Sequence, residues 1–170
     1  MDAQSCDGDE LFTGEGMSSK EVKKYLPHRE PFLLIQHVDT VVPWRKCIAY
    51  NQIRVDDPVF VGHFPGRPIY PGVLILESLA QSFGLLLHAS SQLSVAEFRR
   101  ASGVLSGIDK SRFLHPVLPG ECLRCVVELT AKKPPLYVSH CEAYVGDKKV
   151  AKARVSVCFS WELGDNSSFG

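Results

Sequence analysis

The chain has 170 residues, which suits one domain with a sizeable hydrophobic core. Hydrophobic residues make up 45% and charged residues 22% of the sequence, an ordinary composition for a soluble globular protein. Because 19 Lys and Arg residues balance 19 Asp and Glu residues, the net charge gives no support for nucleic-acid binding. A membrane span, which needs a run of about 18 apolar residues, is not expected either.

The six cysteines are expected to be free thiols in a reducing compartment, because no secretory signal precedes them. This predicts a cytoplasmic protein. Residues 1–17 are acidic and rich in small polar residues, so we expect a disordered N-terminal extension there. A single domain is predicted over residues 18–163, followed by a flexible tail at residues 164–170.

The N-terminal part of this domain is expected to hold one short helix and one β-hairpin. Ser18 or Ser19 can cap a helix that runs through Tyr25. Residues 32–42 are rich in Leu, Ile and Val and predict a strand, and residues 46–55 alternate as its hairpin partner would. Residues 56–72 contain four prolines and three glycines, which predicts a rigid loop.

Residues 73–89 form the longest apolar stretch and are too many for an ordinary strand, so they predict a helix that is buried on nearly all sides. Four further strands are predicted, at residues 101–108, 122–131, 136–145 and 149–161. About six strands and one buried helix predict an α+β domain in which a curved antiparallel sheet wraps the helix.

Two residues, Glu77 and His63, are candidates for a catalytic acid and a catalytic base. Glu77 lies among apolar residues of the predicted helix, and a carboxyl group that stays protonated near neutral pH can act as a general acid. His63 is flanked by glycine and proline, which fix the direction of its imidazole. Each also has an ordinary interpretation, a solvent-facing or ion-paired glutamate and a surface histidine.

Together these two residues suit elimination of water from a 3-hydroxyacyl thioester. A base removes the proton next to the thioester carbonyl, and an acid protonates the departing hydroxyl. Gly72 stands at the helix start, where backbone N–H groups can stabilise the charge on the carbonyl oxygen. Gln81 lies one turn after Glu77 and can orient its carboxyl group, or it can be a polar helix residue without a role.

Three segments resemble the FabZ-type 3-hydroxyacyl-[acyl-carrier-protein] dehydratases. They read LPHREPFLLI at residues 26–35, VGHFPGRPIYPGVLILESLAQ at 61–81 and SGIDKSRFLHPVLPGE at 106–121. A fourth, EAYVGDKKVAKA at 142–153, is similar to the penultimate hairpin of that family. The resemblance covers about residues 20–161 and implies a hot-dog fold, an antiparallel sheet wrapped around a helix.

The resemblance also implies roles for individual residues. His63 would be the base at C2, Glu77 would act on the C3 hydroxyl, and the N–H groups of Phe64 and Gly72 would hold the thioester oxygen. The histidine of one subunit would meet the glutamate of the next, so a homodimer, or a trimer of dimers, is expected. An acyl carrier protein would present the substrate, and no cofactor or metal would be needed.

Some features depart from that family. Gln36 and His37 stand where an acidic and then a basic residue are usual, and Ser78-Leu79 replaces the usual Ala and Met. Because of these differences, a role in a specialised, polyketide-type pathway is a hypothesis alongside a role in fatty-acid synthesis. A hot-dog thioesterase and a non-catalytic acyl-binding subunit are the competing hypotheses.

Other motifs are given ordinary interpretations. Cys122 and Cys125 form a C-x-x-C, but on a strand the two thiols would point to opposite faces, so core packing is favoured over zinc. The basic pairs Arg99-Arg100 and Lys132-Lys133 could contact an acidic carrier protein, although solvated charges are the simpler interpretation. The remaining histidines show no ligand spacing: His28, His37, His88, His115 and His140.

Overall fold

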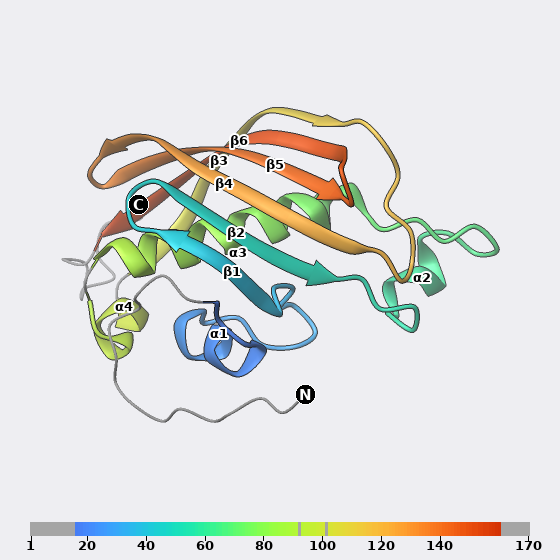
Figure 1. Ribbon diagram of the computed structural model, residues 1–170, viewed down its shortest axis with the longest axis horizontal. Coiled ribbons are helices and arrows are strands. Elements are labelled where there is room, and N and C mark those ends of the chain that lie inside the picture. The colour runs from blue at the N-terminus through green and yellow to red at the C-terminus, as the bar shows by residue number, and fades with distance from the viewer. Residues whose placement is uncertain (1–15, 92, 101, 161–170) are drawn as a thin grey trace, which may run out of the picture.

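The computed structural model describes residues 16–91, 93–100 and 102–160, and it places one long helix in the hollow of a curved sheet (Figure 1). The sheet has six strands in the order β1-β2-β4-β5-β6-β3, and every neighbouring pair is antiparallel. The strands are β1 His37–Val42, β2 Lys46–Gln52, β3 Ser102–Phe113, β4 Cys122–Lys133, β5 Leu136–Val145 and β6 Lys148–Ser160. The predicted α+β arrangement is therefore confirmed.

The central helix α3, Gly72–Ser91, contains the predicted helix at residues 73–89 and extends it at both ends. Its buried side chains include Ile75, Leu79, Phe83 and Leu86, which pack against the sheet. The strands supply alternate side chains to this core, as the pleat requires; in β4 these are Leu123, Cys125 and Val127. Burying side chains of this size stabilises the fold by about 1.5–3 kcal/mol each.

Of the helices described, α3 alone is long and apolar enough to cross a membrane. More than half of its most apolar window is buried inside the protein, as expected of a core helix.

The N-terminal segment packs on the same helix. Met17 falls in the predicted extension, yet its side chain is buried and its backbone exchanges two hydrogen bonds with Val38. Helix α1, Ser19–Tyr25, follows, and Ser18 is its N-cap, with Glu21 accepting a hydrogen bond from the Ser18 N–H at 2.8 Å. Residues 1–15 and 161–170, with the predicted tail, lie outside the described residues.

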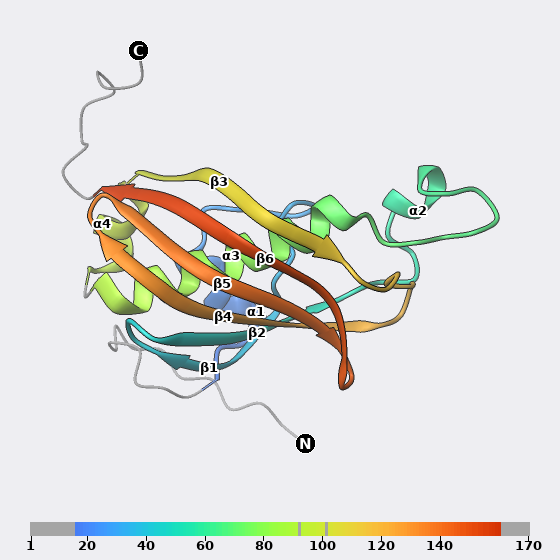
Figure 2. The ribbon, with the colours of Figure 1, turned by 90° about the horizontal axis from the view of Figure 1, so that it is seen from above.

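Two short helices were not expected from the sequence. Helix α2, Val59–Gly62, lies within the predicted loop at residues 56–72. With the chain that leads to α3, it projects beyond the end of the sheet (Figures 1 and 2). Helix α4, Val95–Arg100, follows α3, and it begins with hydrogen bonds between Ser94 and Glu97.

Three strand boundaries differ from the prediction by three residues or more. The first strand covers only His37–Val42, because residues 32–34 hydrogen-bond away from the sheet. The N–H groups of Phe32 and Leu33 donate to the Arg29 oxygen, and that of Leu34 donates to Gln81. The second strand ends at Gln52 instead of residue 55. The third strand runs to Phe113, past residue 108, because β3 continues along β6 through two irregularities in register.

Candidate active site

Glu77 lies in the second turn of α3, and its side chain is 18% exposed, so it is neither fully buried nor a surface residue. Its Oε1 accepts a hydrogen bond from Gln81 Nε2 at 2.9 Å and lies 3.6 Å from His28 Nε2. Within the described part of the chain, its Oε2 has no hydrogen-bond partner. One oxygen of this carboxyl group is therefore held by the protein, and the other is available to a ligand.

Gln81 is almost fully buried, and its amide is fixed at both ends. Its Oε1 accepts from the Leu34 N–H at 2.9 Å, which requires the NH₂ group to face the other way. That group donates to the Phe32 oxygen at 2.7 Å and to Glu77. Gln81 thus ties the segment after α1 to the helix and sets the orientation of the Glu77 carboxyl group.

His63 is the C-cap residue of α2 and is partly buried. Its Nδ1 lies 2.7 Å from the Ile69 oxygen. Because a carbonyl oxygen only accepts, Nδ1 must carry the proton, so a neutral His63 presents an unprotonated Nε2. This is the tautomer that a general base requires. The ring also stacks on Phe64, with 4.1 Å between centroids.

The two expected oxyanion donors differ in their surroundings. The Phe64 N–H points to the Arg67 oxygen over 3.4 Å, a long contact that a ligand oxygen could replace. Gly72 is the first residue of α3, where N–H groups have no partner within the helix. A Cβ atom at Gly72 would lie 2.9 Å from two ring atoms of Phe113. A larger residue at this position would require the Phe113 ring to move, so packing favours glycine whether or not a ligand approaches.

His63 and Glu77 come from different parts of the molecule. Among the described residues, no hydrogen bond or ion pair joins them. His63 belongs to the projecting α2–α3 segment, and Glu77 belongs to the helix inside the sheet (Figure 2). The other expected residues divide in the same way: Phe64 lies beside His63, Gln81 lies beside Glu77, and Gly72 marks the start of α3.

His28 was expected to be an ordinary residue, and the structure places it beside Glu77. Sequence spacing could not show this contact, because 49 positions separate the two residues and no periodic pattern links them. Its place in the LPHREPF segment was the one available signal.

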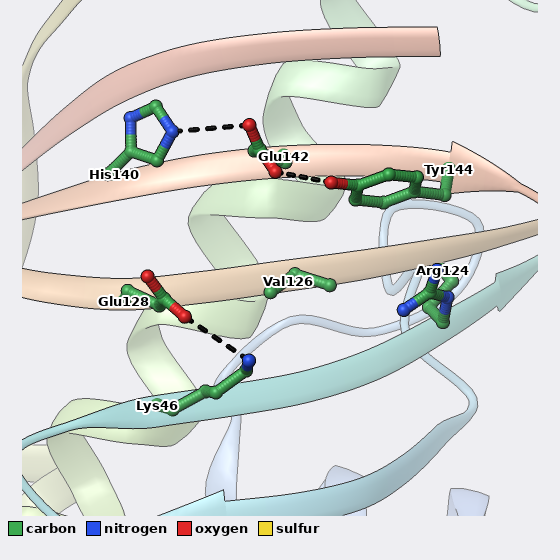
Figure 3. Close-up of a pocket in the computed structure, with 7 residues that line it drawn as sticks. All are labelled: Lys46, Arg124, Val126, Glu128, His140, Glu142 and Tyr144. Carbon is green, nitrogen blue, oxygen red and sulfur yellow. Dashed lines mark hydrogen bonds and ion pairs between the residues drawn. The ribbon is translucent and has the colours of Figure 1, made fainter. Parts of the chain in front are cut away.

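A second polar cluster lies on the face of the sheet opposite α3 (Figure 3). Glu142 accepts hydrogen bonds from Lys149, from the Tyr144 hydroxyl and, over 3.4 Å, from His140 Nε2. Although its partial burial acts in the other direction, these donors lower the pKa of Glu142 to about 2. Arg124 lies over the Tyr144 ring, 4.6 Å from its centroid. These contacts form a structural network without an obvious reactive group.

The two thiols of the C-x-x-C motif lie on opposite faces of β4, as predicted, but the predicted core packing is correct for Cys125 alone. Cys122 is exposed, whereas Cys125 is buried and its pKa is raised to about 12 by burial. Among the described residues, no group of three or more potential ligand side chains could hold a metal ion. In the basic pair Lys132-Lys133, Lys132 lies over the Trp44 ring, with 3.3 Å between Nζ and the ring centroid. The side chains of the other basic pair, Arg99 and Arg100, lie outside the described residues.

A family model described as a FabA-like domain matches residues 26–154. The chain is 46% identical over 128 residues to a 3-hydroxyacyl-[acyl-carrier-protein] dehydratase FabZ of Symbiobacterium thermophilum, covering 75% of this chain and 87% of the relative. A FabZ of Enterococcus faecalis is 40% identical over 136 residues, covering 80% and 93% of the two chains. The chain belongs to the FabZ-type dehydratase family. The resemblance found in the sequence is thereby confirmed.

Solved structures support the hot-dog fold. The dehydratase heterocomplex ApeI:P from Xenorhabdus doucetiae matches with a TM-score of 0.67 at 19% identity, over 82% of this chain and 90% of that one. A hypothetical thioesterase from Streptococcus pneumoniae matches with a TM-score of 0.55 at 11% identity, over 72% and 84%. At such low identities these likenesses show the fold alone, which hosts more than one activity.

Proposed function

We propose that this protein is a hydro-lyase that converts (3R)-hydroxyacyl thioesters into trans-2-enoyl thioesters in fatty-acid or related polyketide-type biosynthesis. The observation that carries the proposal is the hydrogen bond between His63 Nδ1 and the Ile69 oxygen at 2.7 Å, because it leaves Nε2 as a base. The relatives that the chain matches at 46% and 40% identity are named as such dehydratases, which supports the same reaction.

In the proposed mechanism, His63 Nε2 takes the proton from C2, and the electron pair forms the C2–C3 double bond. The C3–O bond breaks, and Glu77 gives its proton to the departing hydroxyl, which leaves as water. The free Oε2 of Glu77 suits this role, since Gln81 occupies Oε1. Transfer of the proton from His63 back to Glu77 then completes the cycle, and no cofactor is required.

The negative charge that develops on the thioester oxygen would be held by the N–H groups of Phe64 and Gly72. The start of a 20-residue helix is a favourable place for this charge, because its N–H groups and its dipole both point there. Preorganised donors of this kind are typically worth about 3–4 kcal/mol each to the transition state.

A homodimer is proposed as the smallest active unit, with His63 of one subunit facing Glu77 of the other. Strand β3 lies at the edge of the sheet and exposes Val104 and Leu105, and an apolar edge of this kind requires a cover. The projecting segment exposes Val61, at 79%, and the first turn of α3 exposes Val73, at 71%. Gly72, at the start of α3, lies against Phe113, at the end of β3. The two exposed apolar regions are therefore adjacent, and a second subunit could bury both. A trimer of dimers would be the next larger assembly.

An acyl carrier protein is the proposed carrier of the substrate, and the cytoplasm is the proposed location. The names of the relatives support the carrier protein. The described cysteines are free thiols, three of them buried in the core, which suits a reducing compartment.

The test is dehydration of a 3-hydroxyacyl thioester by the purified protein, followed by absorbance of the enoyl product and by mass spectrometry. His63→Ala and Glu77→Gln should each lower kcat by about 100-fold or more if they are base and acid. Release of free thiol instead of enoyl product would indicate a thioesterase. Absence of any turnover on both carrier-protein and coenzyme A substrates would indicate an acyl-binding subunit.

A further inference from the structure

His28 is held rigidly beside Glu77. It follows α1, and the Arg29 side chain donates to the oxygens of both Leu26 and His28, at 2.9 and 2.6 Å. Leu26 itself is buried against α3, where a Cβ atom at Gly84 would lie 3.3 Å from it. The backbone that carries the imidazole therefore has little freedom to move away from the helix.

The two ring nitrogens of His28 differ in their surroundings. Nε2 lies 3.6 Å from Glu77 Oε1. Nδ1 is buried, and no hydrogen-bond partner for it lies among the described residues. The ring stacks on Phe32, with 6.0 Å between centroids and 30° between planes. An ordinary surface histidine would keep both nitrogens in water.

These contacts select a tautomer. If the proton of a neutral His28 were on Nδ1, a donor would be buried without an acceptor, and the Nε2 lone pair would face the acceptor oxygen Oε1 of Glu77. Both arrangements are unfavourable. With the proton on Nε2, the ring directs an N–H toward Glu77 Oε1, and a short movement would bring the 3.6 Å separation into hydrogen-bond range. A protonated ring would point the same N–H at Oε1.

We propose that His28 is a positioning residue for the reaction: with Gln81 it directs two N–H donors at Oε1 of Glu77, so that Oε2 faces the substrate hydroxyl. His28 acts through Glu77 and has no contact with substrate in this role. The inference rests on the proposed function, since it assigns a task to a residue that serves the proposed acid.

Two replacements separate this role from a purely structural one. His28→Phe keeps a planar ring for stacking on Phe32 but has no N–H group. His28→Gln loses the ring but can place an amide N–H near the position of Nε2. His37→Phe, at an exposed histidine of β1, is the matched control.

Steady-state dehydration and thermal unfolding are measured for all three variants and for Glu77→Gln. We expect His28→Phe to keep the wild-type melting temperature and KM while kcat falls about tenfold, in line with the cost of misplacing a catalytic group. His28→Gln should recover kcat to within about threefold of wild type, and the control should be unchanged. His28→Phe should have no additional effect in a protein that already carries Glu77→Gln.

Wild-type kcat in His28→Phe would overturn the proposal, and so would an equal loss in both His28 variants that follows their melting temperatures. Full activity of Glu77→Gln in the same assay would instead overturn the proposed function. The two failures are therefore distinguishable.

Discussion

Gln81 lies one helical turn after Glu77 and donates a hydrogen bond from Nε2 to Oε1 of that residue, 2.9 Å away. The same amide accepts from the Leu34 N–H and donates to the Phe32 oxygen. One buried side chain thus connects the fold to the chemistry, because it fixes both the segment after α1 and the proposed acid.

Replacing Gln81 by Met should lower both stability and activity. Methionine fills a similar volume but leaves the Leu34 N–H and the Phe32 oxygen without partners, which should lower the free energy of unfolding by about 1–3 kcal/mol. Loss of the hydrogen bond that orients the Glu77 carboxyl group should lower kcat by about tenfold or more, with a smaller change in KM. Urea unfolding and steady-state kinetics measure the two effects.

Gln52→Met is the control for this experiment. The Gln52 amide is exposed and donates to the Gly120 oxygen in the turn before β4, so both quantities should stay close to wild type. A Gln81→Met variant with reduced stability and unchanged kcat would show that Gln81 serves the fold alone.

The pattern of the sequence was sufficient to predict the central helix and the six strands, apart from some of their ends. A long apolar run predicted α3, and alternation predicted β5 at Leu136–Val145 with both boundaries correct. The first strand was predicted too long because Phe32–Gln36 is apolar enough for a strand. The hydrogen bonds of residues 32–34 go to a turn and to Gln81, a partner 47 positions away from Leu34 that no local pattern reveals.

The sequence allowed part of the candidate site to be predicted as well. His63, Glu77 and Gln81 are candidates from chemistry and spacing, and the structure shows the expected contact between Gln81 and Glu77. The contact between His28 and Glu77 could not be predicted, because it depends on the tertiary structure. Helix α4 was missed although Ser94 and Glu97 have the spacing of a capping box, a signal that was present in the sequence. The projecting position of His63 is a property of the fold and could not be derived from composition.

Mixing two inactive variants should restore activity if the site is shared between subunits. A dimer of one His63→Ala chain and one Glu77→Gln chain has one site with both residues changed and one site with both intact. Random exchange in an equal mixture should therefore recover about a quarter of wild-type activity. Subunits are exchanged by mild denaturation and renaturation, and the rate is compared with each variant treated alone. No recovery despite proven exchange would place both residues of a site in one chain.

Gly72→Ala should destabilise the protein through a specific neighbour. The new Cβ atom would lie 2.9 Å from two atoms of the Phe113 ring, closer than carbon atoms approach each other. Overpacking of this kind typically costs about 1–3 kcal/mol. Because the ring blocks the space, Phe113→Leu should reduce the cost of Gly72→Ala in a double-mutant cycle of unfolding free energies at fixed protein concentration. Strictly additive effects would mean that the clash is relieved elsewhere.

Glu142 should make the stability of the protein depend on acid pH. Although its partial burial acts in the other direction, hydrogen bonds from Lys149, Tyr144 and His140 lower its pKa from 4.5 in the unfolded chain to about 2. A carboxyl group with a lowered pKa in the folded state contributes stability above the unfolded value and loses it as the pH falls toward the folded value. The contribution should therefore be complete above about pH 5 and decline between pH 5 and pH 2.

The measurement is urea unfolding of wild type and Glu142→Gln between pH 3 and pH 7. Because the network is partly exposed, the difference in unfolding free energy should be about 1 kcal/mol at pH 7 and should shrink at pH 3. Glu128→Gln, which removes an exposed ion pair with Lys46 on the same face, should change little at either pH (Figure 3). Dehydration by Glu142→Gln at pH 7 should equal that of wild type, because this network lies on the opposite side of the sheet from Glu77. A difference in stability that grows as the pH falls would contradict the lowered pKa of Glu142.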